Sequence, residues 1–204
     1  MKKLLFVLSL SVLAIMADAQ VPGFCIGPKI GYNSNALSLD KEGISAGLKS
    51  EFQFGAFMRL GKKVYLQPEA NYQIRGGILN DDRATSSSSG EQTIKLKTIS
   101  VPVLLGFRVI NSGPFNLRLM AGPTMSFVID KELKPAEMVG VWPIHSKDDI
   151  KNSIWSLQAG GGIDLFSFTL DVRYEIGLDN MYQGTDDFNL KNNIFNVSLG
   201  FKLL

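Results

Sequence analysis

Apolar and polar residues alternate without a break along residues 64–75, which read VYLQPEANYQIR. Successive side chains of a β-strand point to opposite faces, so a period of two indicates a strand. The stretch therefore predicts a strand with one apolar face and one polar face. The apolar series is Val64, Leu66, Pro68, Ala70, Tyr72 and Ile74, and the polar series is Tyr65, Gln67, Glu69, Asn71, Gln73 and Arg75.

The same alternation recurs along the rest of the chain. Segments of about ten residues with alternating hydrophobicity are typical of transmembrane β-barrels. No helical period of 3.6 residues competes with this pattern after residue 19. We therefore predict an all-β fold, an eight-stranded antiparallel up-and-down transmembrane β-barrel. The predicted strands cover residues 24–33, 51–60, 64–75, 99–109, 115–127, 155–165, 168–176 and 195–203.

The connections between the predicted strands alternate between short and long. Residues 61–63, 110–114 and 166–167 form tight turns, whereas residues 33–50, 76–92, 130–152 and 179–191 form long polar loops. Outer-membrane barrels have short periplasmic turns and longer extracellular loops. We therefore expect all four long loops on the outer side of a membrane and all short turns on the periplasmic side.

Glycines indicate which face of the strands looks inward. An eight-stranded barrel has an interior just wide enough to be filled by side chains, so small residues are needed on its concave face. We therefore expect the polar face inside and the apolar face in lipid. Alternation alone leaves open a soluble, secreted lipocalin-like barrel that binds a hydrophobic ligand. Gly161 lies on the apolar face, and Gly27, Gly31, Gly55, Gly106, Gly122, Gly160, Gly162, Gly177 and Gly200 lie on the polar face.

Aromatic residues of the apolar face cluster near both ends of the predicted strands. Aromatic rings favour the two membrane–water interfaces and form girdles there in barrels of this class. The competing explanation is the general enrichment of aromatic residues in strands. The expected outer girdle is Tyr32, Phe52, Tyr72, Phe127, Trp155 and Phe195, and the expected inner girdle is Phe107, Phe115, Phe168 and Phe201.

Twelve charged residues lie on the face expected to look inward. Buried charges persist when they are paired and hydrogen-bonded, so we expect a structural ion-pair network that fills the lumen. A different interpretation makes Glu69, Asp171 or Glu175 a proton relay or a catalytic acid. A lumen filled in this way is a poor diffusion channel. The expected network consists of Lys29, Glu51, Arg59, Glu69, Arg75, Arg108, Arg118, Asp164, Asp171, Arg173, Glu175 and Lys202.

The N-terminus has the features of a secretory signal peptide. Lys2 and Lys3 precede an apolar run from Leu4 to Met16, and Ala17-Asp-Ala19 supplies a cleavage site. We expect residues 1–19 to be removed and residues 20–204 to form one domain. Removing residues 1–19 takes away two lysines and one aspartate and leaves a net charge of about +1, and no basic patch interleaved with aromatics predicts a nucleic-acid partner.

The sequence offers few residues for catalysis or metal binding. Cys25 is the only cysteine and His145 the only histidine, and His145 lies in the longest predicted loop near Ser146 and Asp148. Proximity in the sequence does not create catalytic geometry, and a metal site needs a cluster of ligands. We predict no enzymatic activity, no cofactor and no metal. A membrane-embedded enzyme is the alternative that this prediction opposes.

Three stretches resemble an outer-membrane β-barrel family that is widespread in Bacteroidetes and is known as PorT-like or porin-family barrels. They are residues 27–33 (GPKIGYN), residues 64–72 (VYLQPEANY) with Gly76-Gly77 behind them, and residues 99–107 (ISVPVLLGF). The resemblance covers essentially the whole mature chain and implies an outer-membrane barrel of a Gram-negative cell. One family member is associated with assembling a secretion system. The chain departs from the barrels' common terminal aromatic residue by ending in Phe201-Lys-Leu-Leu204.

We therefore expect a protein of the cell outer membrane with a structural or interaction role, namely envelope integrity, adhesion or accessory work in secretion assembly. The expected partners are outer-membrane lipid, the barrel insertion machinery and a protein bound at the extracellular loops.

Overall fold

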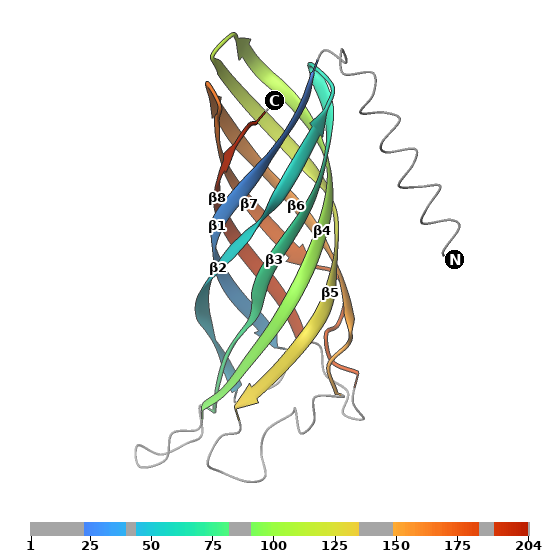
Figure 1. Cartoon of the computed structure of the whole chain (residues 1–204). Helices are drawn as coiled ribbons and strands as arrows, with labels where there is room; N and C mark the ends of the chain where they lie inside the picture. The colour runs from blue at the N-terminus through green and yellow to red at the C-terminus, as the bar shows by residue number, and fades with distance from the viewer. Residues whose placement is uncertain (1–22, 40–43, 82–90, 135–148, 184–189, 204) are drawn as a thin grey trace, which may run out of the picture.

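The computed structural model describes residues 23–39, 44–81, 91–134, 149–183 and 190–203. These residues form eight strands that run back and forth along one axis (Figure 1). The predicted signal peptide lies outside the described residues. The strands are β1 (Phe24–Leu39), β2 (Ile44–Leu60), β3 (Val64–Asp81), β4 (Glu91–Ser112), β5 (Phe115–Lys134), β6 (Ser153–Leu165), β7 (Phe168–Gly177) and β8 (Leu190–Phe201).

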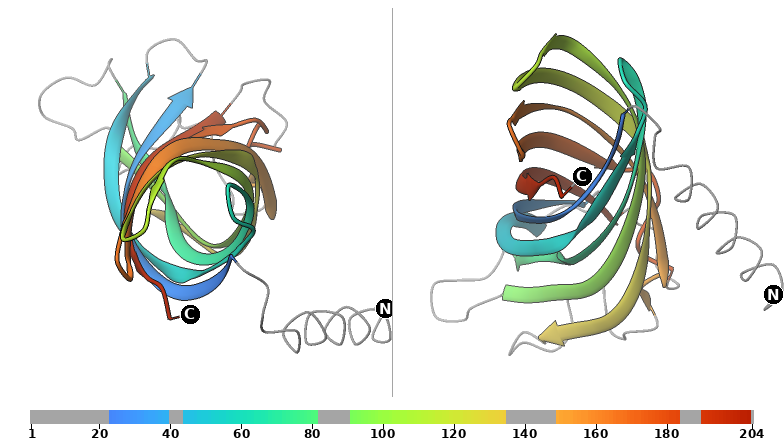
Figure 2. Two further views of the ribbon diagram at one scale, coloured as in Figure 1. Left: turned by 90° about the horizontal axis from the view of Figure 1, so that it is seen from above. Right: turned by 45° about the horizontal axis from the view of Figure 1, so that its top comes forward.

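Each strand pairs antiparallel with the next one in the sequence, and β8 closes the sheet by pairing with β1. The closing register joins Lys29 to Gly200 and Leu39 to Leu190. Seen along its axis the sheet forms a complete ring (Figure 2). Closure satisfies the backbone groups that an open edge would expose to lipid. The prediction of an eight-stranded antiparallel up-and-down barrel is confirmed.

Side chains along the strands alternate between the interior and the outer surface. In β7 the burial alternates at every residue from Phe168 to Gly177. Leu119 is 57% exposed on the outer surface, whereas its neighbour Met120 is 4% exposed. The alternative of a lipocalin-like barrel with an apolar interior is therefore wrong for the body of the barrel, because its apolar series points outward.

The interior is crowded at the glycines of the polar face. A Cβ atom built on Gly106 would lie 2.1 Å from the ring of Tyr65, and one on Gly27 would lie 1.7 Å from the carbonyl oxygen of Phe201. Gly161, on the outer face, leaves 3.3 Å to the nearest atom. Small residues are thus placed where the concave face leaves no room for a side chain.

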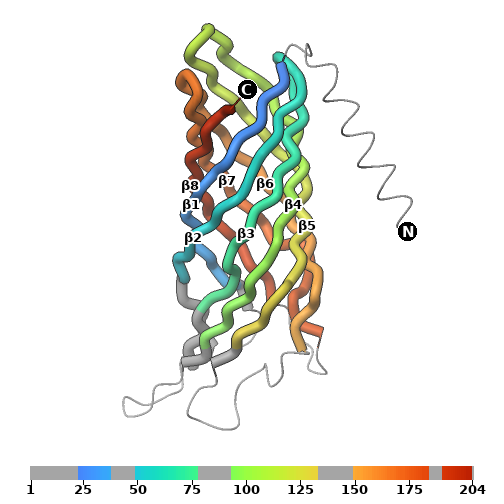
Figure 3. The backbone as a smooth tube through the Cα atoms, viewed as in Figure 1, coloured from blue at the N-terminus to red at the C-terminus, as the bar shows by residue number. Residues whose placement is uncertain are grey.

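The barrel has two different ends. The three short turns, the start of β1 and the end of β8 lie at one end, which we call the turn end (Figure 1). The four longer connections join strands at the opposite end, which we call the loop end. The tube in Figure 3 shows β4 and β5 running nearly the whole distance between them. No helix in the described part of the chain has the length and apolar character needed to cross a bilayer.

The strands extend further toward the loop end than the alternation predicts. β4 begins at Glu91 and has 22 residues, and β5 ends at Lys134 and has 20. The same holds for β1, β2 and β3, which continue into residues expected to form loops. The long loops are therefore shorter than predicted. The packing of apolar side chains at the loop end accounts for the difference.

Candidate functional site: the charged lumen

Nine of the twelve charged residues expected inside the barrel are buried, and the other three lie near its ends. Glu51, Arg108 and Lys202 are partly exposed. The structure thus brings the majority of the set together in the middle of the lumen. The buried nine are Lys29, Arg59, Glu69, Arg75, Arg118, Asp164, Asp171, Arg173 and Glu175.

Glu69 of β3 is the centre of the largest group of contacts. Arg173 of β7 donates to both of its oxygens, Nη1 to Oε2 at 2.9 Å and Nη2 to Oε1 at 2.6 Å. Lys29 of β1 donates to Oε2 at 2.8 Å. Gln67 and Asn71 add amide donors at 2.7 and 3.0 Å. The carboxylate is fully engaged by donors, as a buried charge requires.

The ion pairs continue from Arg173 through alternating charges toward the turn end. Arg173 also contacts Asp171 at 2.5 Å, and Asp171 accepts from Arg118 of β5 at 2.7 Å. Arg118 contacts Asp164 of β6 at 3.0 Å, and Asp164 contacts Arg59 of β2 at 3.1 Å. With Lys29 and Glu69, this chain of charges connects six strands across the barrel: β1, β2, β3, β5, β6 and β7.

Glu175 of β7 forms a second, separate group. It pairs with Arg75 of β3 and accepts hydrogen bonds from Ser156 Oγ at 2.5 Å and Gln158 Nε2 at 2.6 Å. Arg75 belongs to a strand on another side of the ring, so this pair also crosses the lumen. Glu69, Asp171 and Glu175, the three carboxylates considered for a proton relay or a catalytic acid, are thus each held by cations of the protein itself.

Tyr65 of β3 lies among three arginines near the turn end. The guanidinium carbons of Arg59, Arg108 and Arg118 lie 5.1, 5.7 and 6.0 Å from its ring centroid. Its hydroxyl accepts from Arg118 Nη1 at 3.2 Å. The negative face of an aromatic ring attracts cations. Sequence reasoning assigned Tyr65 to the inward series but gave it no role, because the approach of three strands to one ring is not visible in sequence spacing.

An apolar cluster fills the interior at the loop end. Ile150 forms a bridge with Tyr182, and Met181 donates its N–H to the carbonyl of Leu190 at 2.8 Å. These contacts continue the antiparallel pairing beyond the ends of β6, β7 and β8, so residues 149–152 and 180–183 extend the wall of the barrel at the loop end. We call this set the outer apolar cluster: Leu37, Ile94, Leu96, Ile150, Ile154, Met181, Tyr182 and Leu190, with Val128 packed against it.

The outer apolar cluster explains why the strands are longer than predicted. Along β4, Leu96 is fully buried, whereas Lys95 and Lys97 point outward, Lys97 contacting Asp130 at 2.8 Å and Glu132 at 2.6 Å on β5. Further down the same strand Ile99 points outward and Ser100 is buried. Even-numbered residues point inward along both parts of the strand. Toward the loop end, however, the inward residues are apolar and the outward residues are charged. This is the pattern of a barrel surrounded by water, so we infer that the loop end projects beyond the lipid.

The residues of the expected aromatic girdles lie on the outer surface. In the outer set, Tyr72 is half-buried and the other five residues are exposed, and all four residues of the inner set are exposed. Neighbouring members contact each other: the ring centroids of Tyr32 and Phe52 are 5.6 Å apart, and those of Phe168 and Phe201 are 5.3 Å apart. Their function as interfacial anchors stays a prediction.

The remaining candidates for chemistry are sparse in the described residues. Within them, no group of three or more His, Cys, Asp and Glu side chains is arranged to hold a metal ion. Cys25 is buried and free. His145, Ser146 and Asp148 lie outside the described residues.

A family model described as "Outer membrane protein beta-barrel domain" matches residues 18–183 of the chain. Among solved structures, the chain is similar to the outer membrane protein OprG of Pseudomonas aeruginosa, with 12% identity, a TM-score of 0.53, and 89% of this chain and 95% of that one covered. It is also similar to the attachment invasion locus protein Ail of Yersinia pestis in complex with a heparin analogue, with 15% identity, a TM-score of 0.46, and 89% and 99% covered. No curated protein matches the sequence. The similarity to OprG supports the fold described above.

Proposed function

Because the chain belongs to the family of outer membrane protein β-barrel domains, we propose that it is a closed, non-conducting barrel of the outer membrane with a structural or interaction role. It serves envelope integrity, adhesion or the assembly of secretion machinery through the surfaces at its two ends, and not through transport along its axis. The motifs at residues 27–33, 64–72 and 99–107 lead us to place it with the PorT-like barrels of Bacteroidetes.

The observation that carries this proposal is the chain of ion pairs across the lumen. This chain ties six strands together and gives Glu69 and Asp171 cationic partners at 2.8 and 2.7 Å. In the separate second group, Arg75 contacts Glu175 directly. A permeating ion would have to separate buried pairs, and breaking one such pair costs several kcal/mol. The outer apolar cluster adds a dry layer at the loop end. An occupied lumen supports a role that depends on the protein's surface.

The surface at the loop end supports an interaction role. On the loop-end side of the expected lipid band, the outer face carries the charged residues Lys95, Lys97, Asp130 and Glu132. Within the band, the outer face carries apolar side chains instead. Water-exposed strand surface outside the bilayer is available to a protein partner. The lipid-facing body and this projecting end together make the barrel a platform.

Conductance in a planar lipid bilayer tests the proposal. Purified protein, with its insertion verified by flotation with lipid vesicles, is expected to give no stable single-channel current. Steady current carried by single barrels would show an open lumen and would make Arg59, Arg75 and Arg118 selectivity elements of a channel.

A further inference from the structure

The cations of the lumen outnumber its carboxylates, and the surplus lies at the turn end. Of the twelve charged residues expected inside the barrel, seven are Lys or Arg and five are Asp or Glu. Glu51 is partly exposed at the loop end and pairs at 3.8 Å with Lys95, whose side chain points outward, so Glu51 does not neutralise a cation of the lumen. Near the turn end, Asp164 is the carboxylate that Arg59 and Arg118 share, at 3.1 and 3.0 Å. Little negative charge is left for further cations there.

Arg108 and Lys202 are the two cations left over. Lys202 reaches Asp164 only at 4.0 Å, the longest ion pair of the interior. Arg108 forms no ion pair with any described residue, and its Nε is buried without a hydrogen-bond partner. Its guanidinium carbon lies 5.7 Å from the ring centroid of Tyr65. Lys202 follows the last residue of β8, and burial lowers the pKa of its ammonium group. Both groups would gain from a nearby anion.

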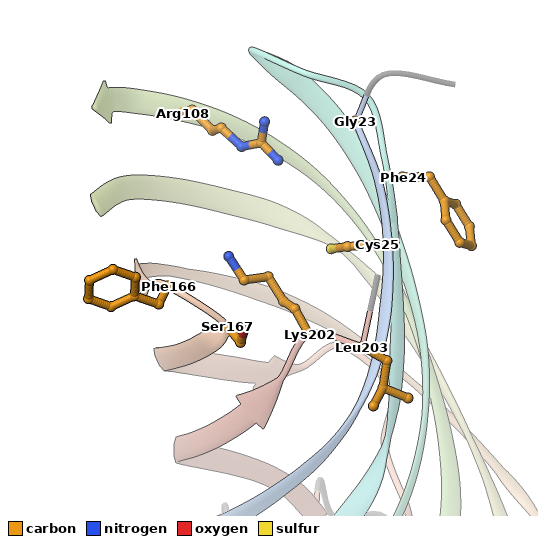
Figure 4. Close-up of a pocket in the computed structure, with 8 residues that line it drawn as sticks. All are labelled: Gly23, Phe24, Cys25, Arg108, Phe166, Ser167, Lys202 and Leu203. Atoms are coloured by element: carbon orange, nitrogen blue, oxygen red, sulfur yellow. The ribbon is translucent and has the colours of Figure 1, made fainter. Parts of the chain in front are cut away.

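Both cations line one cavity at the turn end. The cavity has a volume of about 320 Å³, and none of the described residues that line it carries a carboxylate. Besides the two cations, the lining consists of Gly23, Phe24, Cys25, Phe166, Ser167 and Leu203. Figure 4 shows the side chains of Arg108, Lys202 and Cys25 pointing into the opening of the barrel, whereas Phe24 points away from it. The Ser167 hydroxyl supplies a neutral donor at the same place.

We propose that this cavity binds a phosphate group, held between Arg108 and Lys202. Two cations and no carboxylate match the charge of a phosphate monoester or inorganic phosphate better than that of a single carboxylate. A guanidinium offers paired N–H donors to two oxygens, and the ammonium group adds a point charge. The phosphate can come from a soluble periplasmic compound or from the headgroup of an anionic lipid in the adjacent leaflet.

The test is an NMR titration of the protein in an uncharged maltoside detergent. Inorganic phosphate is added at constant ionic strength, and the Arg108 Nε–H and the backbone amides of Gly23, Cys25 and Ser167 are followed. Saturable shifts confined to the cavity are expected. Shifts that rise linearly without saturation, or that appear equally at both ends of the barrel, would overturn the proposal.

Matched variants separate a built site from general attraction to positive charge. The double variant Arg108→Gln/Lys202→Gln is expected to weaken phosphate binding at least tenfold. The control Lys62→Gln/Lys63→Gln removes the same charge from exposed positions of the β2–β3 turn, outside the lining of the cavity, and is expected to bind within twofold of the parent. An equal loss in both variants would refute the site. If the double variant does not fold, Lys202→Gln alone, beyond the end of β8, gives the same comparison with Lys62→Gln.

A competition experiment distinguishes the two sources of phosphate. Phosphatidylglycerol is added to the micelles before the titration. Loss of the response to inorganic phosphate assigns the site to a lipid headgroup, and an unchanged response assigns it to a soluble phosphate compound. Neither result bears on conductance, so this site and the proposed function stand or fall separately.

Discussion

Arg173 shows how single residues hold the lumen closed. Its guanidinium contacts Glu69 and Asp171 at the same time, and all three side chains are buried. Forming such a group is costly because each charge loses its hydration, and geometry has to compensate for this loss. Removing one member leaves the others buried and unpaired, which is the expensive case.

Replacing Arg173 by Leu is therefore expected to destabilise the barrel by about 3–5 kcal/mol. The control is Lys97→Leu, which breaks ion pairs to Asp130 and Glu132 on the water-exposed outer surface and is expected to have a much smaller effect, because solvent screens such pairs. Reversible unfolding by urea in lipid vesicles measures both. Equal costs would show that the lumen pairs are as well hydrated as the surface ones.

Adjacent residues of β5 separate the two faces energetically. Leu119→Arg places a charge in lipid between Phe115 and Phe127, the girdle residues of the same strand, and is expected to cost about 2–4 kcal/mol. Met120→Gln is expected to cost less, since this position faces an interior rich in polar side chains. The same unfolding measurement ranks the two variants, and the reverse order would mean that the faces are exchanged.

At the scale of strands, β4 shows what the sequence could predict and what it could not. The part from Ile99 to Val109, toward the turn end, alternates with apolar residues outward, so both its existence and its facing followed from the pattern. Toward the loop end, Ile94 and Leu96 point inward, whereas Lys95 and Lys97 point outward. Apolar residues occupy odd positions in the part toward the turn end and even positions in the part toward the loop end. The part toward the loop end therefore looked like a polar loop. A search for period-two segments of opposite phase next to each strand would have found it.

The sequence could predict which charged residues lie in the lumen, but not which of them form ion pairs with each other. The inward phase identified Glu69, Arg118 and Arg173, because facing depends only on odd or even position. Their pairing depends on the shear of the closed sheet, which brings β3 and β7 within contact across the interior. For the same reason Tyr65 could be placed inside the barrel but not among its three arginines.

The outer apolar cluster is expected to stabilise the loop end locally. Leu96→Ala removes a fully buried side chain and should cost about 2–5 kcal/mol in the stability of this end. Hydrogen exchange of the β4 and β5 amides on the loop-end side of Ile99 should accelerate, while exchange on the turn-end side of Ile99 stays unchanged. Lys95→Ala, the outward neighbour, is the control. Acceleration along the whole strand would mean that the two parts of the barrel unfold as one unit.

For the whole molecule, the two ends of the barrel must lie on opposite sides of the outer membrane. Short turns face the periplasm in barrels of this class, so the turn end should be inside and the loop end outside. The chain contains one cysteine, Cys25, which permits labelling of single sites once Cys25 is replaced by Ser. Lys62, in the β2–β3 turn, and Glu132, near the loop end of β5, are both accessible positions.

A membrane-impermeant maleimide applied to intact cells is expected to label Glu132→Cys and to leave Lys62→Cys unmodified, each in the Cys25→Ser background. After the outer membrane is permeabilised, both variants should react, which controls for accessibility of the thiol itself. The reason is geometric: the lipid band of exposed apolar side chains, from Tyr32 and Phe127 at one margin to Phe107 and Phe168 at the other, separates the two positions. Labelling of Lys62→Cys in intact cells, with Glu132→Cys protected until permeabilisation, would invert the barrel and place the phosphate cavity on the outside of the cell.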